Sequence, residues 1–219
     1  MTQTVMAIVP HPDDAEFYAG GLLAKMKSIG ARIIIVNTTD GSKGSFHQSK
    51  PELIRIRTEE ALAAAQILGA EPPIMLGFED FSLSSIAIDV LREKYVRLIR
   101  EYRPDIIVAE DAFSSNEIHP DHRAVAWAAS DAINYAMLPL LYPEHMQDGL
   151  KPHYVAEKYY FSDDPRNVNK IIDIEDTFEI KMAALLAHKS QVEFLVADIY
   201  NQAQSAGLDL KNLLGELYN

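Results

Sequence analysis

The sequence contains no cysteine in its 219 residues. This excludes a disulfide framework, a thiolate-bound metal and a cysteine nucleophile, so any metal must be held by histidine and carboxylate side chains. Basic residues are scarce, since 20 Lys and Arg stand against 32 Asp and Glu, for a formal net charge of -12. We therefore expect neither nucleic acid nor an anionic membrane surface as a partner, because both bind to basic patches.

Long apolar runs are also missing. None approaches the roughly 20 residues that a membrane-spanning helix needs. No basic segment precedes the first short apolar run, as it would in a signal peptide, and we expect a cytoplasmic protein. Apolar residues make up 48% of the chain, which is typical of a globular protein with a full core. A single domain spanning residues 1–219 is the expected organisation.

Strand and helix patterns alternate along the chain. We predict strands over residues 5–9, 31–37, 73–76, 106–109, 155–161 and 171–174, and helices over 15–29, 51–68, 88–102, 123–137, 178–188 and 192–204. This alternation favours an α/β fold with an open, mostly parallel sheet and helices on both faces. We interpret the irregular stretch 139–152 as a lid or a rim of the pocket.

Two tetrapeptides concentrate metal-binding and proton-transferring side chains. They are His-Pro-Asp-Asp at residues 11–14 and His-Pro-Asp-His at residues 119–122, and each follows a predicted strand. Ligands of an open parallel sheet bind beyond the carboxyl ends of its strands. We therefore expect the two tetrapeptides to form one site.

Three of these side chains match the ligands of a catalytic metal. His11, Asp14 and His122 can supply two imidazoles and one carboxylate to a single ion and leave a position open for water. Zinc suits this ligand set, and iron(II) or another divalent ion also suits it. An alternative for Asp14 is a helix N-cap, which is a common role for an aspartate that follows a strand.

The other three side chains are candidates for catalysis. The Asp13 carboxylate can accept a proton from an attacking water. A protonated His119 can donate to the oxyanion that forms on a carbonyl, with Asp121 holding its tautomer and charge. Asp121, like Asp14, has the alternative role of a helix N-cap.

Other polar features have simpler interpretations. We interpret Gly20 and Gly21 as close helix–sheet packing, since the Gly-x-Gly-x-x-Gly pattern of dinucleotide binding is absent. Arg57 and Glu60 have the spacing of a surface ion pair on one helix. Solvated or rim positions are expected for His47, His145 and His153. The single tryptophan, Trp127, is expected to pack against its neighbours.

The sequence resembles the LmbE-like (PIG-L) N-acetylglucosaminyl deacetylases. The resemblance begins with Pro-His-Pro-Asp-Asp-Ala at residues 10–15, followed by the glycine pair, and it includes the His-Pro-Asp-His-Arg segment at 119–123. It extends to the turn at 39–44, the Arg-Thr-Glu-Glu segment at 57–60, the Leu-Gly segment at 76–80 and the His-Lys-Ser-Gln segment at 188–191. It therefore covers most of the chain.

The resemblance implies a Rossmann-like sheet with zinc held by His11, Asp14 and His122. It also implies that Asp13 is the general base and that His119, assisted by Asp121, is the oxyanion partner. Arg57 and Asp80 would contact a sugar, and His188 is a further predicted substrate contact. A homo-oligomer is expected on the same ground.

We therefore predict a zinc-dependent hydrolase that removes the acetyl group from an N-acetylglucosamine-type amino sugar or its conjugate. Two alternatives remain open. The same chemistry can act on a different N-acylated amine, or the chain can be a non-catalytic ligand-binding relative. The presence of Asp13 argues against the non-catalytic alternative, and the missing glycine fingerprint argues against an oxidoreductase.

Overall fold

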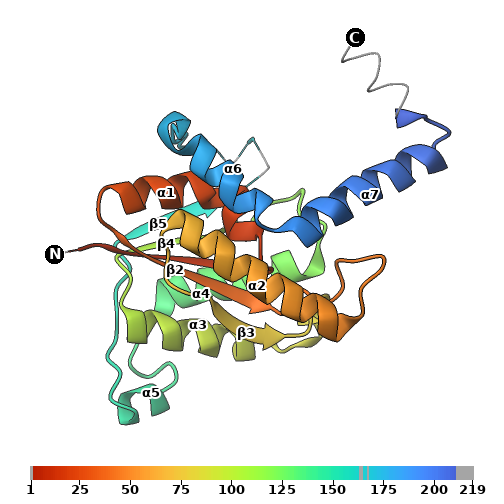
Figure 1. Ribbon diagram of the computed structural model, residues 1–219. Coiled ribbons are helices and arrows are strands. Elements are labelled where there is room, and N and C mark those ends of the chain that lie inside the picture. The colour runs from red at the N-terminus through yellow and green to blue at the C-terminus, as the bar shows by residue number, and fades with distance from the viewer. Residues whose placement is uncertain (1, 163–164, 167, 211–219) are drawn as a thin grey trace.

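Five parallel strands form the centre of the molecule (Figure 1). The structure is a computed structural model that describes residues 2–162, 165–166 and 168–210. Its strands follow the spatial order β3-β2-β1-β4-β5. Their bounds are Thr4–Val9 for β1, Arg32–Thr39 for β2, Ile74–Phe78 for β3, Ile106–Glu110 for β4 and Glu157–Phe161 for β5. The predicted α/β class with an open parallel sheet is confirmed.

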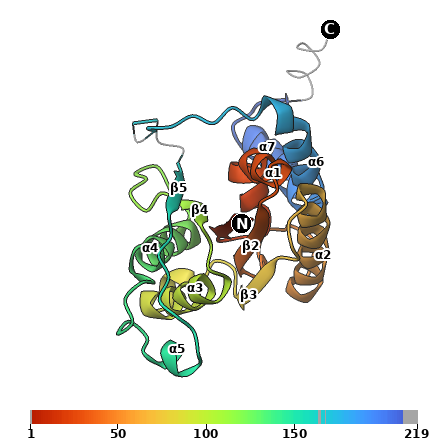
Figure 2. The ribbon, with the colours of Figure 1, turned by 90° about the vertical axis from the view of Figure 1, so that its left-hand side faces the viewer.

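Helices cover both faces of the sheet (Figure 2). One layer contains α1 (Gly20–Ser28), α2 (Lys50–Leu68) and α6 (Phe178–Leu186), with α7 (Lys189–Ser205) projecting from its end. The other contains α3 (Ile88–Tyr102) and α4 (Pro120–Tyr135), and a short α5 (Glu144–Gln147) lies beyond it. Within the described residues, no helix combines the length and the apolar character needed to cross a membrane.

Strand residues alternate between two apolar cores, one under each helix layer. Met6, Ile8 and Ile34 belong to the core beneath α3 and α4. Val5 and Ile33 belong to the core beneath α1 and α2. Because the central strands are buried on both faces, they appear in the sequence as continuous apolar runs rather than as alternating ones.

The order of the strands reverses direction at β1. The chain proceeds from β1 through β2 to β3 on one side and then returns to place β4 on the other side of β1, where Ile8 pairs with Ala109. Loops that leave the carboxyl ends of β1 and β4 diverge there and open a crevice. The tetrapeptides at 11–14 and 119–122 follow these two strands, so the topology brings them together.

Most predicted elements form within two or three residues of their expected bounds, and α3 has the predicted ones. The helix predicted over 15–29 divides into a π-helix, Ala15–Ala19, and α1. The helix predicted over 123–137 begins earlier, because Pro120 occupies its first turn. The strand predicted over 171–174 is wrong, since these residues pair with no strand.

The predicted lid or rim at 139–152 is also wrong. This segment lies at the amino edge of the sheet, opposite the crevice, and is fastened there by the fully buried Arg100. The guanidinium of Arg100 donates to the carbonyls of Ala136, Leu138 and Leu141 at 2.6–3.0 Å. His145, which we expected to be solvated, is completely buried between Arg100 and Glu93 at 2.9 and 2.8 Å.

The other two histidines with predicted solvated or rim positions, and the tryptophan, can be compared with their observed surroundings. His47 is exposed, as expected, whereas His153 contacts the Pro104 carbonyl through Nε2 at 2.7 Å. Trp127 packs against Phe113, with ring centroids 5.1 Å apart, which agrees with a packing role.

Gly21 marks a close approach between α1 and the segment that precedes α6. A Cβ atom at Gly21 would lie 2.5–2.9 Å from the Cδ1, Cβ and Cγ2 atoms of Ile174, whereas one at Gly20 would lie 3.2 Å from the flexible Lys181 chain. The glycine pair therefore packs against the chain around α6, and not against the sheet as we expected.

We predict that Gly21→Ala lowers the free energy of unfolding by about 1–3 kcal/mol, because overpacking outweighs the gain in helix propensity. Gly20→Ala is the matched control and should change stability far less, since Lys181 can move. Urea unfolding measures both variants. A Gly21→Ala protein more stable than the parent would contradict the close packing at Ile174.

Candidate metal centre

Three buried side chains converge at the crevice between β1 and β4. Asp14 Oδ2 lies 3.2 Å from His11 Nδ1 and 3.5 Å from His122 Nε2. The three residues are 8%, 8% and 7% exposed in the order Asp14, His11, His122, and their ligand atoms all lie within 4.8 Å of one another. His11 and Asp14 come from the loop after β1, and His122 comes from the first turn of α4. The arrangement can hold one divalent ion with three protein ligands.

The far side of the His11 ring faces two carboxylates. Its Nε2 lies 3.2 Å from Asp80 Oδ1 and 3.5 Å from Asp121 Oδ2. Metal-binding histidines commonly present their second nitrogen to a carboxylate, which fixes the ring and raises its basicity. The contacts therefore leave Nδ1 as the nitrogen of His11 that points to the ion.

The His122 ring has the same arrangement. Its Nδ1 lies 2.9 Å from Glu110 Oε2 and 3.5 Å from Glu117 Oε2, so Nε2 is free to face the ion. Sequence reasoning did not find these two glutamates. Glu110 offered a signal, because it is an acid at the buried end of an apolar strand, whereas Glu117 lies in an irregular loop without a comparable signal.

Asp80 connects this group to the loop after β2. Besides its contact with His11, it accepts a hydrogen bond from the Lys43 backbone N–H at 2.9 Å through Oδ2. Both carboxylate oxygens therefore have partners inside the protein. The predicted contact of Asp80 with a sugar stays a prediction, and its observed contact is with the His11 ring.

Burial and charge act in opposite directions on these groups. Burial disfavours the Asp14 carboxylate, but the charges of His122 and His11 outweigh it and lower the pKa of Asp14. Burial likewise opposes protonation of His122, yet Asp14 and Glu110 raise its pKa to about 9. Burial raises the pKa of Glu110 to about 7 despite His122 beside it. A bound cation would replace the protons that these rings otherwise carry.

Asp13 lies next to the candidate ligand Asp14 but belongs to a different set of contacts. Its φ of 129° is unusual for a residue other than glycine, and the π-helix begins two residues later. Its Oδ1 accepts from Arg57 Nη2 at 3.0 Å. Burial raises the pKa of Asp13 to about 6, while the charge of Arg57 acts in the opposite direction. This is a favourable value for a group that accepts a proton near neutral pH.

Arg57 is buried, and the predicted surface ion pair with Glu60 is wrong. Arg57 donates to the carbonyls of Pro12 at 2.5 Å and Gly41 at 3.1 Å. Gly41 has a φ of 64°, and a Cβ there would lie 2.7 Å from the guanidinium. Glu60 instead accepts from the backbone and hydroxyl of Ser190 at 2.8 and 2.7 Å. Arg57 thus joins the loops after β1 and β2.

His119 and Asp121 contact different parts of the site. The His119 ring lies 4.8 Å from the ring of His11, and its Nδ1 accepts from the Asp121 backbone N–H at 3.2 Å. The Asp121 carboxylate accepts from the backbone N–H groups of Phe81 and Leu83 at 2.6 and 3.0 Å. The predicted carboxylate–imidazole hydrogen bond is therefore not present. The backbone of Asp121, rather than its side chain, sets the His119 tautomer.

This difference changes the expected form of His119. Because Nδ1 accepts a hydrogen bond, the neutral ring carries its proton on Nε2. Burial lowers the pKa of His119, and the charges of His11 and His122 lower it further. His119 can thus act as a neutral donor, whereas we had expected a protonated one.

His188 is buried at the start of α7. It is 1% exposed, and neither ring nitrogen has a hydrogen-bond partner among the described residues. Its Nε2 lies 3.4 Å from Glu16 Oε2. A substrate contact from His188 stays a prediction, because the ring is covered in this structure.

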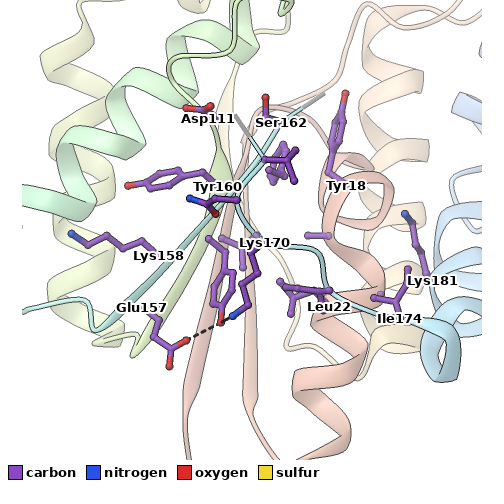
Figure 3. Close-up of a pocket in the computed structure, with 18 residues that line it drawn as sticks. Tyr18, Leu22, Asp111, Glu157, Lys158, Tyr160, Ser162, Lys170, Ile174 and Lys181 are labelled. Atoms are coloured by element: carbon purple, nitrogen blue, oxygen red, sulfur yellow. Dashed lines mark hydrogen bonds between the residues drawn. The ribbon is translucent and has the colours of Figure 1, made fainter. Parts of the chain in front are cut away.

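A cavity of about 690 Å³ lies beside β5 (Figure 3). It lies between β5, the first turns of the helical segment 15–28 and the stretch 168–174, and Tyr18, Asp111 and Ser162 line one end. The Tyr18 ring stacks on Phe161 at 4.7 Å and lies 6.3 Å from the His122 ring. Tyr18 therefore lines the cavity and also lies near one of the candidate ligands.

Comparison with known proteins finds one family. The model of the GlcNAc-PI de-N-acetylase family (PIG-L) matches residues 6–133, which include His11, Asp14 and His122. Diacetylchitobiose deacetylase of Thermococcus kodakarensis is 34% identical over 190 residues, covering 85% of this chain and 69% of that protein. The probable N-acetyl-alpha-D-glucosaminyl L-malate deacetylase 2 of Bacillus cereus is 27% identical over 210 residues, covering 91% and 89%.

A solved structure gives the same result. The N,N'-diacetylchitobiose deacetylase from Pyrococcus horikoshii, in complex with its inhibitor MPG, superposes with a TM-score of 0.79 and 30% identity. The match covers 86% of this chain and 70% of that one.

We predict that the protein binds one divalent ion per chain and that His122→Ala loses most of it, because Nε2 of this ring faces the candidate ion site. Glu110→Gln should weaken the affinity for the ion about 10- to 100-fold, since the carboxylate that supports the ring is lost. Elemental analysis and competition with a chelator measure both effects. Glu101→Gln, an exposed acid on α3, is the control, and full occupancy in His122→Ala would contradict the ligand set.

Proposed function

Because this chain belongs to the GlcNAc-PI de-N-acetylase (PIG-L) family, we propose that it is a metal-dependent hydrolase that removes the acetyl group from an N-acetylglucosamine-type amino sugar or its conjugate. One observation carries this proposal. A carboxylate that is not needed as a ligand, Asp13, is held beside a buried His-Asp-His group at the crevice of the sheet. The deacetylase names of the relatives support the choice of reaction.

The proposed ligands are His11 through Nδ1, Asp14 and His122 through Nε2. Zinc is the ion we propose, on the basis of its preference for imidazole and carboxylate, and iron(II) suits the same donors. When bound, such an ion supplies Lewis acidity, which polarises the amide carbonyl and makes water more acidic. The carboxylates behind the two rings fix the rings in place for this purpose.

Asp13 is proposed as the general base. It would take a proton from the water that attacks the amide carbon and later deliver a proton to the departing amine. Arg57 holds the carboxylate through the 3.0 Å contact with Oδ1, and it fixes the preceding residue through the Pro12 carbonyl. In this proposal the second oxygen of Asp13 would face the attacking water.

His119 is proposed as the second donor to the carbonyl oxygen. As the carbon becomes tetrahedral, this oxygen gains negative charge, and the Nε2–H of a neutral His119 can donate to it. Asp121 acts as a positioning residue, because it holds the turn at Phe81 and lies 3.5 Å from His11. A neutral donor needs no change in its protonation state before it donates this hydrogen bond.

Other expectations remain proposals. Arg57, Asp80 and His188 are proposed to lie around the substrate, although their observed contacts are with protein groups. A single domain over residues 1–219, the homo-oligomer and the cytoplasmic location are carried forward as predictions. The reaction on a different N-acylated amine is the second candidate, since the ligands and the base do not themselves select a sugar.

We predict that the zinc-loaded protein releases acetate from N-acetylglucosamine oligosaccharides or conjugates. The test is a panel that includes diacetylchitobiose, N-acetylglucosaminyl malate and acetylated amines without a sugar ring, with free amine measured before and after treatment with a chelator. Loss of activity on chelation and its return with metal are expected. Activity confined to compounds without a sugar ring would favour the second candidate.

Asp13→Asn should keep the ion and lose about 10²–10⁴-fold in kcat, because an amide cannot accept the proton. Glu59→Gln is the control, since this exposed acid lies on the same helix as Arg57 and pairs with the nearby Arg55. Metal content and kcat are measured on the same samples. A near-parental kcat in Asp13→Asn would remove Asp13 from the role of base.

A further inference from the structure

Phe81 is placed unusually for a large apolar residue. It is 57% exposed, at the turn that follows β3. Its φ is 60°, in the left-handed region that bulky side chains rarely adopt. The ring lies beside the proposed oxyanion donor His119, with centroids 5.2 Å apart and planes at 83°. An apolar surface is therefore presented at the mouth of a site whose other groups are charged or polar.

The turn that carries Phe81 is fastened to the site on both sides. Asp121 accepts from the backbone N–H of Phe81 at 2.6 Å and from that of Leu83 at 3.0 Å. On the preceding residue, the Asp80 carbonyl accepts from Lys43 Nζ at 2.6 Å. These contacts fix the backbone of Phe81, so the position of its ring relative to His119 is set by groups that belong to the site.

The fold gains little from this side chain. Glycine adopts a positive φ without the steric cost that a phenylalanine carries. A ring that stays mostly in solvent recovers little of that cost through burial. Strained residues that are held firmly by their surroundings cluster where a ligand binds. This placement indicates that the Phe81 ring contacts a bound molecule and not another part of this chain.

The position of Phe81 indicates which chemical group of a substrate its ring can contact. A sugar ring has faces of C–H groups, which favour contact with an aromatic ring, while its hydroxyl and amide groups need polar partners. The amide must lie against His119 for the proposed reaction, so the adjacent ring of Phe81 is within reach of the sugar that carries this amide. In such a complex the small acetyl group would lie closer to the buried candidate metal ligands and would not need an exposed surface.

We infer that Phe81 is the residue that recognises the apolar face of the amino sugar next to the scissile amide, and thereby selects a sugar over other acylated amines. This inference rests on the proposed function. Phe81 is a substrate-binding residue in this assignment and takes no part in proton transfer.

The test compares Phe81→Leu, Phe81→Gly and Phe81→Tyr in the zinc-loaded protein. Phe178→Leu is the control, because Phe178 is a comparably exposed phenylalanine, 47% exposed, at the start of α6. We expect Phe81→Leu and Phe81→Gly to raise KM for diacetylchitobiose about tenfold, with kcat within about threefold of the parent, since uniform binding is lost. Phe81→Tyr and Phe178→Leu should keep the parental KM.

Two further measurements give the test independent readouts. The affinity for glucosamine, followed by ligand-observed NMR, should fall in Phe81→Gly and Phe81→Leu in parallel with the rise in KM. The midpoint of urea unfolding should not fall in Phe81→Gly, because glycine relaxes the positive φ. If Phe81→Gly does not fold, Phe81→Leu carries the same comparison.

The outcomes separate this inference from the proposed function. Parental KM and glucosamine affinity in Phe81→Leu, in a protein that deacetylates sugars, would overturn the inference and leave the function standing. If the parent deacetylates no sugar yet binds glucosamine through Phe81, the function falls and the recognition stands. If the parent neither deacetylates nor binds an amino sugar, both fall.

Discussion

A surplus of buried negative charge controls the architecture of this site. Carboxylates gather around two imidazoles and one guanidinium, and each ring lies between an inner carboxylate and an outer pair. Buried charges are costly unless they are paired, so the loops that carry them must meet at one point. The pairing of β1 with β4 makes that meeting possible, and a divalent cation is the group that would complete the charge balance.

Much of this arrangement follows from local sequence. The buried strands appear as apolar runs, and the two His-Pro-Asp tetrapeptides come directly or shortly after neighbouring strands. The carboxylates behind the His122 ring could not be predicted in this way. Glu110 and Glu117 reach His122 only through the placement of α4 on the sheet. The segment 171–174 shows the opposite failure. Its apolar residues form no strand, because Ile174 packs against Gly21, more than 150 positions earlier in the sequence.

The start of α4 explains why the role of Asp121 was not predicted. With His119 as the N-cap, Asp121 lies inside the first turn, and its carboxylate points to the backbone of the turn after β3. A helix starting a few residues later, as we expected, would have left Asp121 at the cap and beside His119. A shift of two or three residues in a helix start, which is within the usual uncertainty of such patterns, therefore reassigns a side chain at the site.

Arg100 acts as a clamp that holds the excursion between α4 and β5 at the amino edge of the sheet, opposite the crevice. Its guanidinium is saturated by the carbonyls of Ala136, Leu138 and Leu141 and by His145, all at the amino edge. This side chain and others on α3 thus fasten the excursion between α4 and β5. Residues of this excursion that make none of these contacts can therefore change without altering the crevice. The structure of this excursion at the amino edge of the sheet is thus independent of the chemistry at the carboxyl edge.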